Sequence, residues 1–170
     1  MKLKKLAFLT LFAGMIPFLV TSCGKTSDQP KCLAVGSARS VMITENADEP
    51  GSYIVTVNGS NPSTVLLTQK PQRNSRVIET ESFMDNWDTS YKTSAPNVTF
   101  TSVSPNRTTT NVLVLTNPSY DAKTQTMTFK AEKLENEVDS VQTGTFTNVT
   151  ITYDSEVDVM LYQEKPQETE

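Results

Sequence analysis

The chain of 170 residues contains no histidine, which removes several kinds of chemistry at once. Catalysis by Ser-His-Asp or Cys-His groups, zinc sites with imidazole ligands and general acid-base catalysis by histidine all require that side chain. The six glycines are too few and too scattered to form a phosphate-binding loop. We therefore expect no catalytic residue, no metal site and no cofactor.

Cysteine is almost as scarce, since Cys23 and Cys32 are the two cysteines of the chain. Their spacing matches no metal-binding motif and provides no framework of several disulfides. A thiol at Cys32 of an exported protein either pairs with another chain or is inert. The sequence leaves these two alternatives open.

Positive charge is sparse beyond the N-terminus. Without residues 1–22, which hold three lysines and no acid, the chain has 12 basic and 19 acidic residues and a formal charge of 12 − 19 = −7. A domain with this charge and no basic cluster gains nothing from counterion release on a polyanion. Nucleic acid is therefore not an expected partner.

The chain has one extended apolar run, Leu6 to Val20, directly after the basic stretch Met1 to Lys5. The run is too short to span a membrane as a helix, which takes about 20 residues. A basic start followed by an apolar run and small residues is typical of a secretory signal peptide. We expect residues 1–22 to be this signal and the protein to be exported.

The residues Val20-Thr21-Ser22-Cys23 resemble the lipobox of bacterial lipoproteins. The resemblance implies cleavage before Cys23, a diacylglyceryl group on its thiol, and a further acyl chain such as palmitate on the new amino group. Two or three acyl chains hold a protein firmly to a bilayer, whereas one chain holds it marginally. Gly24 stands where inner-membrane lipoproteins carry Asp, which favours the outer membrane. The alternative is an ordinary signal peptide cut near Ser22.

The mature chain divides into three parts by composition. Small and polar residues in 23–39 predict a lipidated flexible tether. Residues 40–163 alternate short β-branched and aromatic runs with turn residues, which predicts one mainly β domain: an antiparallel β-sandwich of seven or eight strands with one short helix, with a barrel as the second choice. Residues 164–170 are expected to be a disordered tail.

The expected strands are defined by apolar runs between turn signals. Asn58-Gly59 and Asn117-Pro118 are among the predicted turns. Two strands show a period of two and place their apolar members inward: Met127, Phe129 and Ala131 in one, and Val149, Ile151 and Tyr153 in the other. The strands are Val41 to Thr44, Tyr53 to Val57, Thr64 to Thr68, Val98 to Val103, Val112 to Thr116, Thr126 to Glu132, Phe146 to Tyr153 and Val157 to Tyr162.

One segment has helical spacing instead. Thr80 is a candidate N-cap, and Phe83, Met84, Trp87 and Tyr91 then form an apolar stripe. We expect this helix to cover an open end or edge of the sheets.

A weaker resemblance, to a group of uncharacterised exported bacterial proteins, spans about residues 64 to 133. It includes Thr68-Gln69-Lys70-Pro71-Gln72-Arg73 and Ala95-Pro96-Asn97-Val98. The resemblance implies no activity but suggests that the segment from Pro71 to Asn97 forms one unit of turn, helix and turn. Its candidate recognition surface is Arg73, Trp87, Tyr91 and Asn97; the alternative is a purely architectural unit.

Acidic residues offer two further hypotheses. A carboxylate pair near Trp87, either Glu79 with Glu81 or Asp85 with Asp88, could serve a carbohydrate-active enzyme, although such carboxylates are commonly just solvated. Glu135, Glu137 and Asp139 could attract Ca²⁺, but they lack the spacing of an EF-hand loop.

The function that these observations favour is a membrane-anchored exported lipoprotein that acts as a non-enzymatic binding or envelope-structural module. Its partners would be the membrane, through the lipid on Cys23, and an envelope protein or a glycan. The alternatives are the carbohydrate-active enzyme and a surface adhesin that binds glycan or protein.

Overall fold

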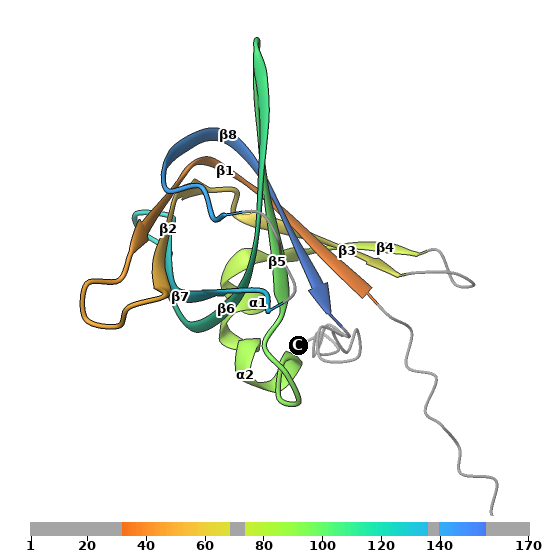
Figure 1. Cartoon of the computed structure of the whole chain (residues 1–170). Coiled ribbons are helices and arrows are strands. Elements are labelled where there is room, and N and C mark those ends of the chain that lie inside the picture. Colours follow the sequence, from red (N-terminus) through yellow and green to blue (C-terminus); the bar gives the residue numbers. More distant parts are fainter. Residues whose placement is uncertain (1–31, 69–73, 136–139, 156–170) are drawn as a thin grey trace, which may run out of the picture.

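The computed structural model describes residues 32–68, 74–135 and 140–155. Within these ranges, eight antiparallel strands form one sheet, and two short helices separate the fourth strand from the fifth (Figure 1). The mainly β fold predicted from the sequence is confirmed. The elements are β1 (Cys32–Glu45), β2 (Ser52–Ser60), β3 (Ser63–Thr68), β4 (Ser75–Glu79), α1 (Thr80–Asp85), α2 (Trp87–Ser90), β5 (Asn97–Ser104), β6 (Arg107–Asp121), β7 (Thr126–Lys133) and β8 (Gly144–Ser155).

The sheet closes on itself through β1. The strand order is β2-β7-β6-β5-β8-β1-β3-β4, and β1 also pairs with β2, so that six strands complete a ring. The second half of β1 contacts β2, for example at Val41 and Val57, while its first half pairs with β3, for example at Val35 and Val65. The arrangement is therefore barrel-like, and the hairpin of β3 and β4 extends the sheet beyond the ring.

Period-two alternation determines which side chains fill the ring. Met127, Phe129 and Ala131 of β7 are buried, as are Val149, Ile151 and Tyr153 of β8, which confirms the predicted inward faces. Each strand of the ring buries alternate apolar side chains in one common core.

Two predicted turns lie inside strands. Asn58-Gly59 belongs to β2, where Gly59 has a φ of +61° and a Cβ would lie 3.1 Å from the Cβ of Arg39. Asn117-Pro118 belongs to β6, at a bulge in its pairing with β7, and Asn117 has a φ of 51°. Neither pair ends its strand: β2 pairs with β1 as far as Ser60, and β6 resumes its pairing with β7 at Ser119.

The predicted tether is too long at its C-terminal end. Cys32 to Arg39 form the first half of β1, so these residues belong to the folded domain and not to the tether. Cys32 and Ala34 are fully buried, and Ala34 pairs with Tyr153 of β8. These small side chains gave no local signal, because their burial depends on pairing with β3 and β8, which are distant in the sequence. Residues 23–31, the tail 164–170 and the predicted strand Val157 to Tyr162 lie outside the described residues.

The helices pack against one end of the ring (Figure 1). Phe83 and Trp87 contact the ring of Tyr153, at centroid distances of 5.1 and 5.8 Å, and Trp87 also lies 5.3 Å from Phe129. The predicted single helix is divided at Asn86, whose Nδ2 donates a hydrogen bond to the carbonyl oxygen of Ser82. The predicted cap is also wrong: Thr80 is buried, and its Oγ1 donates to the carbonyl oxygen of Asn61.

No helix in the described part of the chain is long and apolar enough to cross a membrane.

Candidate functional site

The predicted recognition surface is partly outside the described residues and partly buried. Arg73 is not described, and neither is Cys23. Trp87 is 4% exposed and Tyr91 is also buried, whereas Asn97 is exposed at the start of β5. Tyr91 and Asn97 line a hollow of about 210 Å³, and Trp87 and Tyr91 line another of about 330 Å³. The structure thus places these three residues in one region, with the indole packed into the aromatic cluster.

The acidic residues of this region face water. Glu79, Glu81, Asp85 and Asp88 are all exposed. Of the pair Asp85 and Asp88, Asp88 lines the hollow beside Trp87. Glu135 of the acidic patch is exposed, while Glu137 and Asp139 lie outside the described residues. Among the described residues, no cluster of three or more His, Cys, Asp or Glu side chains could hold a metal ion.

A larger hollow, of about 610 Å³, lies between the start of β6 and the segment that leads into β8. Its volume is within the range of about 300–1,000 Å³ that is usual for ligand pockets. We call it the β6 hollow. Its described lining consists of Arg107, Thr110, Asn111, Val112, Ser140, Val141 and Gln142.

A chain of hydrogen bonds joins three residues of the β6 hollow. Arg107 donates through Nη2 to Oε1 of Gln142 over 2.6 Å. The backbone N–H of Gln142 donates to Oδ1 of Asn111 over 2.8 Å. Because these two bonds occupy Oε1 of Gln142 and Oδ1 of Asn111, both carboxamides are oriented with their NH₂ groups available as donors.

Asn111 is the unusual member of this group. It is 4% exposed, and its Nδ2 is buried without a hydrogen-bond partner among the described residues. A buried donor without an acceptor costs about 1–3 kcal/mol, so native proteins contain few of them. Such an atom at the wall of a hollow is a candidate for ligand recognition.

The charge of the described lining favours an acceptor as the ligand. Arg107 is its charged residue, and the lining contains no carboxylate. The guanidinium and the two carboxamide NH₂ groups are donors, and Thr110 and Ser140 add hydroxyl groups that donate or accept. The hollow thus suits a ligand with several oxygen acceptors.

Sequence reasoning missed this site because no motif marks it. Asn111 ends a run of threonines, and such a run is typical of the solvent-exposed face of a strand. The available signal was its position: Asn111 is in phase with Leu113 and Leu115, so the period of two places a polar side chain on the inward face of β6.

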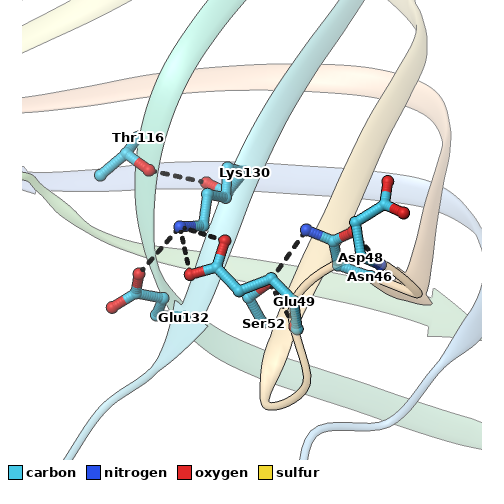
Figure 2. A network of polar contacts seen from close by, with 7 residues as sticks. All are labelled: Asn46, Asp48, Glu49, Ser52, Thr116, Lys130 and Glu132. Atoms are coloured by element: carbon cyan, nitrogen blue, oxygen red, sulfur yellow. Dashed lines mark hydrogen bonds and ion pairs between the residues drawn. The ribbon is translucent and has the colours of Figure 1, made fainter.

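A second polar network lies on the outside of the ring (Figure 2). Nζ of Lys130 is 2.8 Å from Oε2 of Glu49 and 3.5 Å from Oε1 of Glu132. The hydrogen bond to Glu49 raises the pKa of Lys130 above its usual value, and burial opposes the shift. The network links the turn between β1 and β2 to β7. Glu49 and Glu132 are exposed, Lys130 is partly exposed, and the three charges are paired with one another. We call this network the clamp around Lys130 and assign it a small contribution to stability.

Comparison with known proteins identifies no relative: no family model, no curated protein and no solved structure matches the chain.

Proposed function

We propose that this protein is an exported lipoprotein, anchored to the cell envelope through acylated Cys23, whose barrel acts as a non-enzymatic binding module. The outer membrane is the proposed location in a Gram-negative cell. Attachment is supported by the order of basic residues, apolar run, small residues and cysteine at the start of the sequence. The observation that carries the binding role is the buried Asn111 donor at the wall of the β6 hollow.

The ligand we propose is a glycan that presents carboxylate or acetamido oxygens. Nδ2 of Asn111 is shielded from water. The hydrogen bond between Arg107 and Gln142, in the same lining, is exposed, and we propose that the ligand displaces it to reach Nδ2. An exposed hydrogen bond is replaced at little cost, because water or ligand satisfies both partners. The ligand would then accept from Arg107, Asn111 and Gln142 together, and the charge on Arg107 would strengthen a bond to a carboxylate.

Two alternatives keep some support at the helical end. Burial of Trp87 against Phe129 and Tyr153 favours an architectural role for that end, in keeping with an envelope-structural module. If the protein were instead a carbohydrate-active enzyme or an adhesin, its ligand would bind in the hollow lined by Trp87 and Asp88.

The test of the binding role is an NMR titration of the full-length mature protein in detergent with glucuronate and N-acetylglucosamine. We expect the side-chain amide signals of Asn111 and the backbone amide signal of Gln142 to shift with at least one sugar. The variant Asn111→Asp keeps the acceptor for Gln142 but loses the donor, and it should bind that sugar at least ten-fold more weakly. Asn61→Asp, at an exposed asparagine that lines none of the three hollows and whose Oδ1 accepts from the backbone N–H of Ser63, is the matched control and should bind as the parent does. Absence of any shift, or equal weakening in both variants, would refute the proposed site.

A further inference from the structure

The outer face of β1, β3 and β4 carries a contiguous group of apolar side chains. One apolar row crosses all three strands, because Val35 pairs with Val65, which in turn pairs with Val77. Beside it, Leu33 of β1 pairs with Leu67 of β3. Val77 is 65% exposed and Leu67 is 38% exposed. We call Leu33, Val35, Val65, Leu67 and Val77 the hairpin face.

The opposite side of the same strands is already covered. Cys32, Ala34 and Leu66 alternate with residues of the hairpin face and are buried in the core. β4 is also the end of the strand order, with β3 as its one strand neighbour among the described residues. An apolar surface beside an open sheet edge is a common place for an interaction.

The hairpin face lies close in the sequence to Cys23, and this position indicates what surface it contacts. Leu33 directly follows the first residue of β1, and Cys32 follows Cys23 by 32 − 23 = 9 residues. Nine residues span at most about 30 Å, even when fully extended. Two further strands at about 4.8 Å spacing carry the face from β1 to β4, so all of it lies within reach of the acylated residue. Figure 1 shows β3 and β4 beside the start of β1, while the hairpin of β5 and β6 projects in another direction.

We propose that the hairpin face docks on the surface of the bilayer that holds the lipid anchor. This inference rests on the proposed acylation of Cys23. The tether keeps the face at an effective concentration of the order of millimolar at the membrane, so that a weak intrinsic affinity is sufficient. Docking would fix the orientation of the barrel and leave the start of β6, on the other side of the ring, open to ligands.

Charge restricts the kind of bilayer that fits. Glu79 and Asp154 are exposed at the border of the hairpin face, and the chain from residue 23 onward has a formal charge of 12 − 19 = −7. An anionic surface repels such a domain. The face therefore suits a zwitterionic surface, and vesicles of phosphatidylcholine are the appropriate probe.

The experiment compares two exposed valines in the acylated full chain. Val77→Cys and Val103→Cys are each labelled with an environment-sensitive fluorophore; Val103 is 58% exposed near the tip of the β5–β6 hairpin and serves as the matched control. The parent protein, in which Cys32 is buried, measures background labelling. Each variant is reconstituted in phosphatidylcholine vesicles with and without a lipid-borne quencher.

We expect the label at residue 77 to shift to the blue on reconstitution and to lose most of its intensity to the quencher, while the label at residue 103 does neither. Docking is refuted if the protein floats with the vesicles but both labels remain aqueous. It is refuted in favour of self-association if the shift at residue 77 appears without vesicles and grows with protein concentration. Docking is also refuted if the shift at residue 77 appears without vesicles and does not depend on protein concentration, because another segment of the same chain then covers the hairpin face. If the chain carries no acyl group and does not float with the vesicles, both the proposed attachment and the proposed docking are refuted.

Discussion

Oδ1 of Asn111 accepts a hydrogen bond of 2.8 Å from the backbone N–H of Gln142, and this bond ties β6 to the segment that leads into β8. The two residues are 31 positions apart in the sequence. The bond gives the segment a fixed place beside the strand, and it leaves the other end of the carboxamide as a buried donor.

The Asn111–Gln142 bond should control local opening of this segment. In Asn111→Ala the amide of Gln142 loses its acceptor, and its hydrogen exchange should accelerate by about five- to ten-fold, which corresponds to about 1 kcal/mol for one hydrogen bond. Hydrogen exchange followed by NMR measures this. The amide of Leu115, which donates to the carbonyl oxygen of Pro96, is the internal control and should be unchanged. Equal acceleration at both amides would mean global destabilisation instead.

The indole of Trp87 should behave as a buried core residue. It is the one tryptophan of the chain and is 4% exposed, so the emission of the protein reports on it alone. We expect blue-shifted fluorescence, little quenching by iodide, and a red shift with strong quenching only on unfolding. Strong quenching of the folded protein would place the ring at the surface and return Trp87 to the candidate recognition surface.

Phe83 should be essential to the stability of the packing between the helices and the ring. The side chain is fully buried and contacts the rings of Trp87, Tyr91 and Tyr153. Phe83→Ala should lower the free energy of unfolding by about 3–5 kcal/mol, through lost burial and a cavity. Phe83→Leu keeps most of the volume and should cost clearly less. Urea denaturation compares the two, and a loss below about 1 kcal/mol in the alanine variant would contradict the packing described here.

Tyr153 should couple stability to alkaline pH. Burial raises the pKa of its phenol above the ordinary value of about 10, and its hydroxyl contacts Sδ of Met127 at 3.8 Å. The phenol ionises more readily in the unfolded chain, so the stabilisation is complete below pH 10 and is lost as the pH rises above it, by about 1.4 kcal/mol per unit. Tyr153→Phe has no group to ionise, so its free energy of unfolding should fall less steeply above pH 10. Identical slopes for the two proteins would contradict the burial of this hydroxyl.

The clamp around Lys130 should be sensitive to salt. Its partners Glu49 and Glu132 are exposed, so added salt screens the pairs. The melting temperature of Lys130→Met should lie slightly below that of the parent at low ionic strength, and the difference should disappear in about 1 M NaCl. Lys123→Met, at an exposed lysine in the turn between β6 and β7, is the matched control. A difference that persists in high salt would indicate packing by the lysine stem.

Local patterns predicted those parts of the fold whose residues carry their own signal. Met127 and Val149 belong to strands in which apolar and polar side chains alternate, and both are buried as expected. The first half of β1 was missed because Cys32 and Ala34 are small, and their burial depends on pairing with β3 and β8. β4 was missed because it is short and exposed, and it exists through its ladder with β3.

The candidate site was harder to predict than the fold for the same reason. Trp87 was predicted as a recognition residue because it is the one tryptophan of the chain, but it packs against Phe129 and Tyr153 from distant strands. Asn111 is one asparagine in a polar run, and it becomes notable only when Gln142 is placed beside it. A site assembled from separate strands leaves no spacing in the sequence.

The most direct test of the account is the intact mass of the protein extracted from membranes of cells that express the full chain. We predict a mature chain that begins at Cys23 and carries a diacylglyceryl group on its thiol, with or without a further acyl chain on its amino group. A chain that begins at another residue, or a Cys23 without acyl mass, would contradict the proposed attachment.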